Sequence, residues 1–499
     1  MKRKPFSEFV GVDTTPLHVS ATGSKTQGHL LWGDGVKRSG KQSGGRIEVK
    51  ARGKTGWIAE SALGGESLLE VYFIDVGQGD GVLIKTPEFR HIMIDGGNPR
   101  ERQNTGKNAA DFVDWKFVKD YGRKAIELDA IIASHNDLDH YGGLADLLDA
   151  AQATQLDAKE VTVERFCHAG LSWWLNGGKR TLGRTAKKGG KSYYTQLLVD
   201  RASAESASAP GGGGPTLQGN WGAFIRQAVA AKASDGTPSP FTRLSNKSGH
   251  LPGFAPGDGE AVIRVLGPVE ETVGGKPALP KFKSNSTTTN GNSILLRLDY
   301  GRTRILLTGD LNTESQNLLL EAFAGDRLEF QCDVAKGCHH GSEDVAFSFL
   351  QAMKAAVTVI SSGDAEGHDH PRPRIVAASG AAGHVTLDKD ELITPLVYST
   401  ELARSTSFGT PVSLSFKDGQ GQDVELTGSR LSSARVEYTE RLPGAIRPRK
   451  GARRLSGPSI VAGLIYGLVN VRTDGEMILT ATLNEGKGTW TVKKFKSRF

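Results

Sequence analysis

The chain has 499 residues and a net charge of +7, from 62 basic and 55 acidic side chains, and apolar residues make up 37% of it. These values are ordinary for a globular protein of two to four domains of about 150 residues each, and the mild basic excess suits a polyanionic partner without proving one. Three cysteines are too few for a disulfide scaffold, and no apolar run of about 18 residues occurs, which excludes a membrane channel. Reduced thiols and the lack of an apolar signal segment lead us to expect a cytoplasmic protein.

Residues 1–65 consist of short alternating segments that Gly and Ser interrupt, a pattern typical of a small antiparallel β barrel. We expect six apolar side chains to fill its core, namely Leu17, Leu31, Trp32, Ile47, Val49 and Trp57. The closing segment GWIAESAL resembles the end of bacterial SH3-like domains. That resemblance implies a module that binds a protein or peptide partner, cell wall or its own neighbouring domain. We interpret Trp57 as a core residue rather than as a platform for a ligand.

Residues 66–430 alternate between apolar strands and helical segments, which indicates an α/β layered domain. Strands are expected in LLEVYFIDVGQGDGVLIKT, HIMIDGG and LDAIIASH, and a helix in NAADFVDWKFVKDYG with Phe112, Trp115 and Val118 on one side. Residues 150–290 are less regular, and we expect an insertion of elaborated loops there. Residues 431–499 are expected to form a basic linker followed by C-terminal β hairpins that turn at Asp-Gly.

The segment SHNDLDHYGG places four potential metal ligands directly after an apolar strand: His135, Asp137, Asp139 and His140. Imidazole and carboxylate together suit Zn, Mn or Fe better than a metal that prefers thiolates. A charged helix N-terminus is the simpler alternative, because Asp and Asn are common caps. Caps rarely need two histidines that alternate with two aspartates, so the segment predicts metal binding.

Further candidate ligands follow other strands: Asp95 in IDGG, Asp310 in LLTGD, and His339 and His340 in KGCHHGS. The carboxyl ends of strands in an α/β core converge on one edge, where sites are normally built. One such aspartate would be weak evidence, but several that each adjoin a glycine or a helix support one another. Together they predict a metal centre at this edge.

These motifs, in this order, resemble the metallo-β-lactamase superfamily, and most closely its ComEC/Rec2-like branch. The pieces are FIDVGQGDG with Asp75 and Asp80, IDGG, SHNDLDHYGG, NGNSILL with Asn290, LLTGD, CHHGS and a late GHDHP. The resemblance implies a four-layer αββα sandwich, preceded here by the SH3-like barrel, with one or two divalent ions at an edge of its two sheets. It also implies hydrolysis of phosphodiesters, with DNA favoured over RNA as the nucleic-acid partner.

The resemblance assigns His135 and Asp137 to a first metal position. Most of the superfamily has a histidine in place of Asp137, and Asn290 stands where a further histidine ligand is usual. These replacements make the position richer in oxygen and shift its expected preference from Zn toward Mn or Mg. The ComEC-like branch shares them, so they do not by themselves indicate a lost activity.

A second metal position is assigned to Asp139, His140 and one histidine of the HHGS segment, with Asp310 bridging both ions. The sequence leaves open which of His339 and His340 is the ligand. Asp139 is also expected to take part in catalysis. Because the choice between His339 and His340 is open, both histidines are candidate ligands.

Six further residues are expected to support or complete the reaction. Asp75, Asp80, Asp95 and Asn290 are expected to lie behind the ligands, and Asp95 to orient a ligand histidine. His370 is a candidate to donate a proton to the leaving group or to grip a phosphate, and Lys336 to neutralise a phosphate charge. The alternatives are a histidine that only fixes a proline turn and a solvated lysine.

No Ser-His-Asp arrangement and no Walker-type loop is visible, so a metal-activated hydroxide is the nucleophile that the sequence offers. The basic stretches at residues 179–191 and 441–454 suit a nucleic-acid backbone, although such runs are often solvated loops. Three hypotheses follow: a metal-dependent nuclease, suggested as a bacterial defence effector; a phosphodiesterase for a small substrate; and a catalytically silent binding protein. The intact ligand set argues against the third.

Overall fold

The computed structural model describes residues 4–103, 106–149, 151, 155–209, 215–363, 368, 370–400, 407–409, 412–440, 449–454, 460–462, 468–484 and 488–499. The chain forms two compact units, one of residues 1–403 and 466–499 and the other of residues 404–465. Residues 441–448 of the basic stretch predicted at 441–454 lie outside the described residues. No helix among the described residues is both long and apolar enough to cross a membrane.

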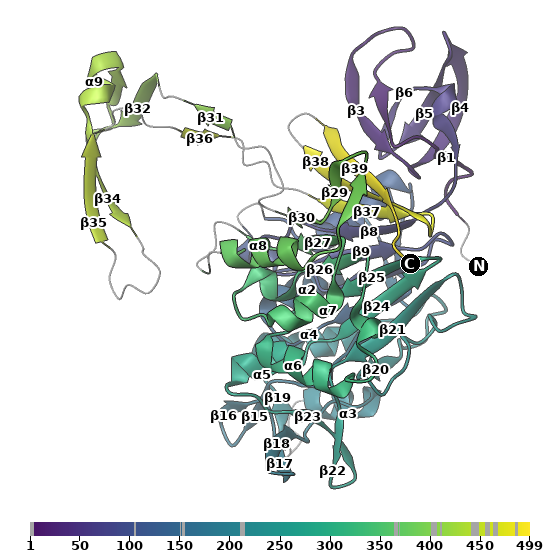
Figure 1. Ribbon diagram of the computed structural model, residues 1–499, viewed down its shortest axis with the longest axis vertical. Coiled ribbons are helices and arrows are strands. Elements are labelled where there is room, and N and C mark those ends of the chain that lie inside the picture. Colours follow the sequence, from purple (N-terminus) through teal and green to yellow (C-terminus); the bar gives the residue numbers. More distant parts are fainter. Residues whose placement is uncertain are drawn as a thin grey trace. The chain divides into compact units, whose positions relative to one another are not determined.

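The first unit begins with a seven-stranded antiparallel sheet, which we call the N-terminal β module (residues 8–65; Figure 1). Its strand order is β3-β2-β6-β5-β4-β1-β7. The strands are β1 (Glu8–Val10), β2 (Thr14–His18), β3 (Thr26–Leu31), β4 (Gly35–Ser43), β5 (Arg46–Ala51), β6 (Lys54–Ala59) and β7 (Leu63–Gly65).

The core of the N-terminal β module contains three of the six side chains expected there: Leu17, Ile47 and Val49. The expectation was wrong for Leu31 and Trp32, which pack against Leu68 and against C-terminal strands of the chain. Since side chains alternate along a strand and Leu30 points into the module's core, Leu31 must face outward. Trp57 is only half-buried.

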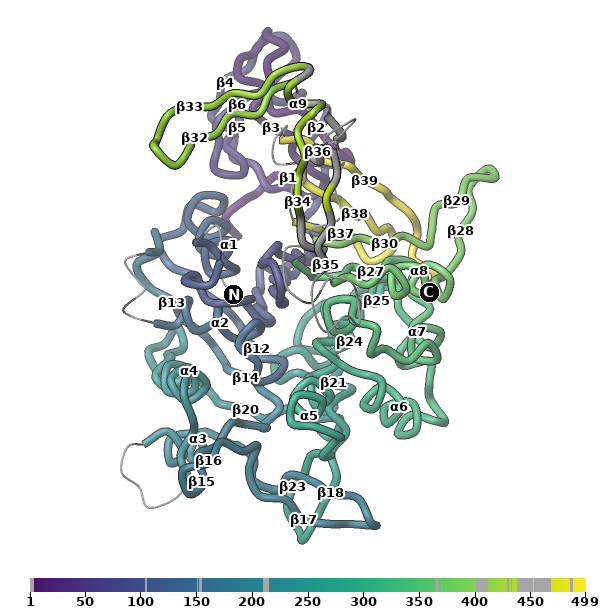
Figure 2. The backbone as a smooth tube through the Cα atoms, turned by 90° about the vertical axis from the view of Figure 1, so that its left-hand side faces the viewer, coloured from purple at the N-terminus to yellow at the C-terminus, as the bar shows by residue number. Residues whose placement is uncertain are grey.

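Two larger sheets form the body of the first unit (Figure 1, Figure 2). The first has the order β20-β14-β12-β10-β9-β8-β37-β38-β39, and the second β21-β24-β25-β26-β27-β30. The first sheet's strands are β8 (Leu69–Phe73), β9 (Val82–Lys85), β10 (His91–Ile94), β12 (Ala130–Ala133), β14 (Phe166–His168), β20 (Phe241–Arg243), β37 (Val469–Thr473), β38 (Met477–Asn484) and β39 (Thr489–Lys496). The second sheet's strands are β21 (Ala261–Gly267), β24 (Leu295–Tyr300), β25 (Thr303–Leu307), β26 (Val334–Lys336), β27 (Val357–Ile360) and β30 (Leu396–Ser399).

Alternation along the strands explains the layers. In β8, Val71 and Phe73 join an apolar core between the two sheets, whereas Tyr72 joins a second core under helices. In β25, Ile305 faces the space between the sheets and Leu306 the helices on the other side. Each fully buried side chain of this size stabilises the fold by about 1.5–3 kcal/mol. The layer order helix, sheet, sheet, helix confirms the predicted αββα sandwich.

Helices cover the outer face of each sheet. Those of the first sheet are α1 (Ala109–Trp115), α2 (Leu138–Leu148), α3 (Arg201–Ser208) and α4 (Gly219–Ala230). Those of the second are α6 (Thr313–Ala322), α7 (Phe347–Met353) and α8 (Pro373–Ala382), and a short α5 (Asn285–Gly291) precedes β24. The helix predicted around α1 continues into a π turn at Lys116–Asp120. Its fully buried side includes Val113 and Phe117, while Phe112, Trp115 and Val118 are half-buried.

Smaller strands complete both units. In the first unit they are β11 (Ile126–Leu128), β13 (Val161–Val163), β15 (Trp174–Asn176), β16 (Lys179–Thr181), β17 (Thr185–Lys188), β18 (Lys191–Tyr194), β19 (Thr216–Leu217), β22 (Glu271–Val273), β23 (Lys276–Pro280), β28 (Thr386–Asp388) and β29 (Glu391–Thr394). In the second unit β31 (Ser407–Gly409) pairs with β36 (Ile460–Ala462), β32 (Ser413–Lys417) with β33 (Asp423–Thr427), and β34 (Arg435–Glu440) with β35 (Arg449–Arg454), and α9 spans Gly428–Ser433.

The last strands of the chain belong to the first sheet, because β37 pairs antiparallel with β8. Arg472 of β37 is fully buried and donates to the Trp32 carbonyl at 2.6 Å and to Asp34 at 2.7 Å. Its guanidinium also lies 3.5 Å from Glu70 of β8. A buried charge cluster thus joins the N-terminal β module to the sheet that carries part of the site.

Candidate metal centre

The candidate ligands converge at one edge of the two large sheets. Asp95 follows β10, His135 follows β12, Asp310 follows β25 and His340 follows β26. Each of these strands runs parallel to a neighbour, so their carboxyl ends meet at that edge. The edge predicted from the strand pattern therefore holds the cluster.

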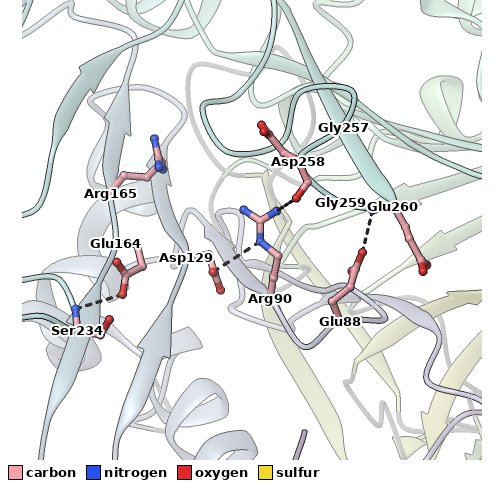
Figure 3. Close-up of a pocket in the computed structure, with 10 residues that line it drawn as sticks. All are labelled: Glu88, Arg90, Asp129, Glu164, Arg165, Ser234, Gly257, Asp258, Gly259 and Glu260. Carbon is pink, nitrogen blue, oxygen red and sulfur yellow. Dashed lines mark hydrogen bonds and ion pairs between the residues drawn. The ribbon is translucent and has the colours of Figure 1, made fainter. Parts of the chain in front are cut away.

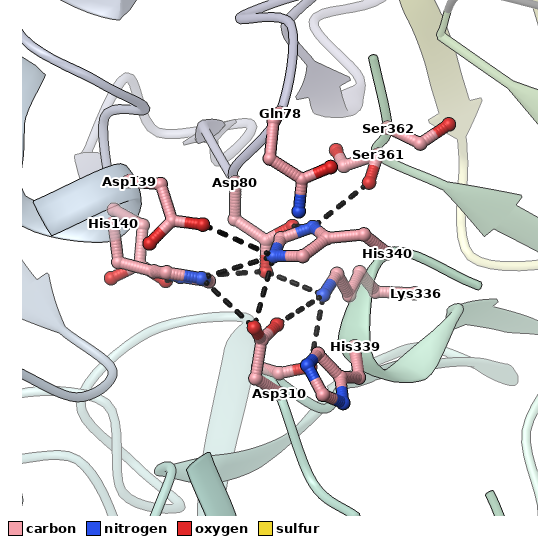
Figure 4. Close-up of polar contacts among 12 residues, drawn as sticks. Gln78, Asp80, Asp139, His140, Asp310, Lys336, His339, His340, Ser361 and Ser362 are labelled. Carbon is pink, nitrogen blue, oxygen red and sulfur yellow. Dashed lines mark hydrogen bonds and ion pairs between the residues drawn. The ribbon is translucent and has the colours of Figure 1, made fainter. Parts of the chain in front are cut away.

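One group of donors surrounds the second predicted metal position (Figure 4). The Asp310 Oδ2 atom lies 3.2 Å from His140 Nε2 and 2.9 Å from His340 Nε2. The two Nε2 atoms are 3.2 Å apart, and Asp139 Oδ2 lies 3.7 Å from His340 Nε2. Two imidazoles and two carboxylates at this spacing make a donor set that divalent transition metals favour.

The tautomers of these histidines are set by their second ring nitrogens. His140 Nδ1 lies 2.9 Å from the Asp95 carboxylate, and His340 Nδ1 lies 3.0 Å from the Ser361 carbonyl. Both partners only accept hydrogen bonds, so both Nδ1 atoms donate. In the neutral rings, the Nε2 lone pairs then face each other and a carboxylate, an arrangement that only a cation or added protons can satisfy. The residues present therefore fit a divalent metal ion.

The pKa values of the two histidines also indicate that the cluster favours positive charge. Burial opposes protonation, yet Asp310 and Asp80 raise the pKa of His340 to about 9. Burial likewise opposes it at His140, but Asp310 and Asp95 raise the pKa of that imidazole well above its ordinary value. Protons on these rings take the place that a bound cation would fill.

A second group of donors forms the first predicted position. His135 Nε2 is buried without a hydrogen-bond partner and lies 3.8 Å from Asp137 Oδ2. With its amide nitrogen turned toward Asp137, Asn290 donates to that carboxylate at 3.0 Å and accepts from His339 Nε2 at 3.1 Å. Burial and the neighbouring Asp139 raise the pKa of Asp137 to about 7. The buried, unpartnered nitrogen and this carboxylate also fit a metal ion.

The two histidines of the HHGS segment thus serve different positions. Both have left-handed backbone angles, with φ of 48° at His339 and 52° at His340. Such angles are uncommon outside glycine and cluster at functional sites. The turn directs His340 toward the second group of donors and His339 toward Asn290 beside the first, and this favours His340 as the candidate ligand of the second position.

Asp80 and Lys336 lie directly behind the ligands (Figure 4). The Lys336 ammonium is buried, 2.5 Å from Asp80, 3.4 Å from Asp310 and 2.9 Å from the Gly309 carbonyl. Burial opposes the charged forms, but the two groups lower the pKa of Asp80 and raise that of Lys336. The lysine thus holds one oxygen of Asp310 while the other faces the histidines.

Two of the predicted site residues lie apart from the donor groups. Asp75 lines a separate pocket with Lys107 and Asn108. The His370 ring is centred 6.0 Å from the His339 ring, and its Nδ1 atom is buried without a hydrogen-bond partner. Burial lowers the pKa of His370 to about 4, with further lowering by His340 and His339, so the ring is neutral at pH 7.

Glycine pairs allow the loops of the site to approach. Gly96 N–H donates to the His140 carbonyl at 2.6 Å, and Gly143 N–H donates to the Gly97 carbonyl at 3.0 Å. A Cβ atom on Gly143 would lie 2.0 Å from the Gly96 carbonyl oxygen, closer than real contacts allow. The glycines of IDGG and DHYGG therefore hold the loop that carries Asp95 against helix α2.

Three contacts were not foreseen from the sequence. The Ser134 hydroxyl donates to Asp95 at 2.5 Å, and the Ser293 hydroxyl lies 3.2 Å from His135 Nδ1. Trp173 Nε1–H donates to the carbonyl of Asn136, between His135 and Asp137, at 3.2 Å. Ser134 and Ser293 stand inside the quoted motifs and could have been found there, whereas nothing in the sequence places Trp173 at the site.

A cavity of about 680 Å³ lies elsewhere, at the amino ends of the first sheet's parallel strands (Figure 3). Arg90 directly precedes β10, Asp129 precedes β12 and Arg165 precedes β14, so this cavity is at the edge opposite the metal centre. Its described lining contains no histidine. The donor groups, and not the size of a cavity, mark the candidate site.

Comparisons with known proteins point to one superfamily. Residues 74–191 match the metallo-beta-lactamase superfamily. "ComE operon protein 3" of Bacillus subtilis (strain 168) is 28% identical over 88 residues, which cover 17% of this chain and 11% of that protein. "Competence protein ComA" of Neisseria gonorrhoeae is 35% identical over 83 residues, which cover 16% of this chain and 12% of that protein.

Among solved structures, a mutant of CmlA beta-hydroxylase has a TM-score of 0.28 and 10% identity, covering 64% of this chain and 50% of that one. A likeness at this level carries no argument. The match at residues 74–191 includes residues 74–81 of FIDVGQGDG, the strand that leads into IDGG, and the segment SHNDLDHYGG, which supply Asp80, Asp95 and four candidate ligands. Residues 74–191 therefore match a domain of the metallo-β-lactamase superfamily, whose members are generally metal-dependent hydrolases.

Proposed function

We propose that the protein is a metal-dependent phosphodiesterase that cleaves nucleic acid, with DNA favoured over RNA. The observation that carries the proposal is the pair of Nε2 atoms, 3.2 Å apart, that face Asp310 with both Nδ1 atoms committed elsewhere. When bound, one or two divalent ions, Zn or Mn and also Mg, would activate water and neutralise charge on a phosphodiester.

The chain's own residues would hold the ions and orient the ligands. Asp139, His140 and His340 would hold one ion and His135 with Asp137 the other, and Asp310 lies within reach of donors from both groups. Asp95 fixes the His140 ring, and Lys336 holds Asp310 from behind. Because Asp95, His140, Asp310 and Lys336 are buried and already hydrogen-bonded, these four groups need little rearrangement when substrate arrives.

His370 fits one of its two predicted roles better than the other. A neutral imidazole is a weak proton donor at pH 7, and burial keeps this ring neutral. It can still donate a hydrogen bond to a phosphate oxygen near the first position. We therefore assign His370 to gripping the substrate, and the proton of the leaving group to solvent.

Positive charge beside the site favours a polyanionic substrate. The Arg180 guanidinium lies 3.8 Å from the centre of the Trp173 ring, and Trp173 is bonded to the loop between His135 and Asp137. Arg180 is exposed, as are Lys179 and Lys188 of the same basic stretch. A guanidinium held on an indole at the rim of a metal site suits a phosphate of a nucleic-acid backbone.

The relatives support the same substrate class, because one is named as a competence protein and the other as a product of the ComE operon. The chain covers only 11% and 12% of their lengths, so their activities come to this chain as part of the proposal. We retain the other sequence-based expectations in the same way: a cytoplasmic setting, a bacterial defence role, and an SH3-like module at residues 1–65 that binds a protein or peptide.

A cleavage assay tests the proposal. Protein stripped of metal and reloaded with Zn, Mn or Mg is given circular and linear duplex DNA, single-stranded DNA, RNA and a chromogenic phosphodiester. We expect metal-dependent DNA cleavage that His140→Ala abolishes and that His250→Ala, which alters a histidine away from the cluster, preserves. Cleavage of the small diester alone would replace the nuclease by a small-substrate phosphodiesterase. No turnover with any metal would refute the enzyme hypothesis.

A further inference from the structure

A second candidate binding site lies between the N-terminal β module and the hydrolase sandwich. It is a cavity of about 380 Å³. Its walls come from β3 and β6 of the module, from Trp115 at the end of α1 and from Trp490 in β39. Both sides belong to one compact unit, and the Arg472 cluster fixes their junction. Nothing in the metal centre accounts for this cavity.

The lining of the cavity is cationic. Arg52 and Lys54 contribute to it, and no carboxylate occurs among its described lining residues. Arg52 Nη1 and His29 Nδ1 are buried without a hydrogen-bond partner. Arg52 lies 3.6 Å from Asp34, beyond hydrogen-bond distance, and that carboxylate is already bound by Arg472. A buried guanidinium nitrogen without an acceptor is costly unless a ligand supplies the acceptor, so the cavity suits an anion.

The same cavity has aromatic walls. The Arg52 guanidinium lies 4.9 Å from the Trp490 ring centre and 5.7 Å from the Trp115 ring centre. Trp490 is held in place because its Nε1–H donates to the His29 carbonyl at 3.2 Å. Two indole rings beside an arginine, one of them fixed, present flat apolar surface next to positive charge, the combination that binds a base and its phosphate.

We infer that this cavity binds a small anion that carries a flat ring, of the size and chemistry of a nucleoside monophosphate. Its volume falls in the range of about 300–1,000 Å³ that small-molecule sites occupy. The phosphate is bound by Arg52 and Lys54, and the base lies against the tryptophans. The inference does not depend on the proposed nuclease activity, since the cavity shares none of the candidate ligands of the metal centre.

Calorimetric titration of the full chain tests the inference. The protein is the His140→Ala variant in EDTA, so that no ligand can be held through the metal centre. AMP is expected to bind at one site, and both adenosine and inorganic phosphate at least about tenfold more weakly, because each lacks half of the recognised chemistry. AMP should also quench tryptophan fluorescence.

Matched variants locate the site. Arg52→Gln is expected to raise the Kd for AMP by about tenfold or more, and Lys54→Gln by a smaller factor. Lys50→Gln removes an exposed cation two residues away that does not line the cavity, and should change the Kd by less than about twofold. Thermal melting checks that Arg52→Gln remains folded, and Lys54→Gln serves if it does not. No AMP binding at about 1 mM, equal binding of phosphate, or an unchanged Kd in both lining variants would refute the inference.

Discussion

Replacing Arg472 tests how the N-terminal β module is held to the sandwich. Arg472→Met keeps the length of the side chain and removes its charge. The wild-type guanidinium is fully buried and donates to Asn470 at 2.6 Å, to the Trp32 carbonyl at 2.6 Å and to Asp34 at 2.7 Å. Each hydrogen bond to a charged group contributes about 1.5–3 kcal/mol, and removing one partner of a buried pair costs about 3–5 kcal/mol.

The expected loss in the free energy of unfolding is about 4 kcal/mol, the middle of that range, and not the sum of the separate bonds. Asp34 keeps the Leu31 N–H at 2.8 Å, and Glu70 keeps Lys85 at 2.7 Å, so the carboxylates are not left wholly unpaired. Urea unfolding followed by tryptophan fluorescence measures the change, because Trp32 lies at the junction.

Arg38→Met is the matched control. Arg38 also forms short contacts to carboxylates, at 2.9 Å to Glu8 and 2.8 Å to Glu60, but at the surface of the module. Exposed pairs contribute little because water screens them. If Arg472→Met lowers the urea midpoint no more than Arg38→Met does, the buried cluster does not stabilise the junction and the reasoning fails.

Three further predictions concern the site and the same charges. Asp95→Asn should weaken metal binding about 10- to 100-fold in calorimetry, because the carboxylate no longer fixes the ligand imidazole, and unchanged affinity would contradict that role. Arg180→Gln should weaken DNA binding, and the slope of the logarithm of the binding constant against the logarithm of salt concentration should fall by the equivalent of about one phosphate contact. Lys187→Gln changes an exposed cation of the same stretch and serves as the comparison. The third prediction concerns Asp34 and Glu70. Burial opposes ionisation of both carboxyl groups, but nearby cations depress their pKa values below the ordinary 3.8 and 4.5. Their stabilisation is therefore complete above those values and lost as pH falls through the lower folded-state values. Acid unfolding should show a smaller pH dependence in Arg472→Met than in wild type, and equal slopes would argue against the cluster.

The convergence of the candidate ligands could be predicted because they follow recognisable strands. An apolar run ends at His135, another at Asp310, and parallel strands bring such ends to one edge. The different directions of the His339 and His340 side chains could not be predicted, because they depend on two successive left-handed residues that turn the side chains apart. Sequence pattern reports which residues are near an edge, but not how a tight turn aims them.

Long-range pairing is the other feature that local pattern does not contain. The hairpin around residues 474–476 was predicted, but its position in the sheet was not, because any exposed strand edge could have accepted β37. The choice depends on contacts such as the bond between Arg472 and Asp34, which are 438 residues apart. The same pairing explains why Leu31 and Trp32 face away from the core of the module: their partners are C-terminal residues.

The two halves of the metal centre differ in chemistry, and this difference should appear in metal loading. The second position offers two imidazoles that are fixed by Asp95 and the Ser361 carbonyl. The first offers one imidazole and Asp137, whose pKa of about 7 requires loss of a proton before a metal binds at or below neutral pH. Nitrogen donors favour Zn, so Zn should fill the second position first and the first position only more weakly, with proton release. Zn titration at pH 6 and pH 8 should therefore show two unequal steps, of which the weaker strengthens with pH. Two equal steps at both pH values would refute this division of the site.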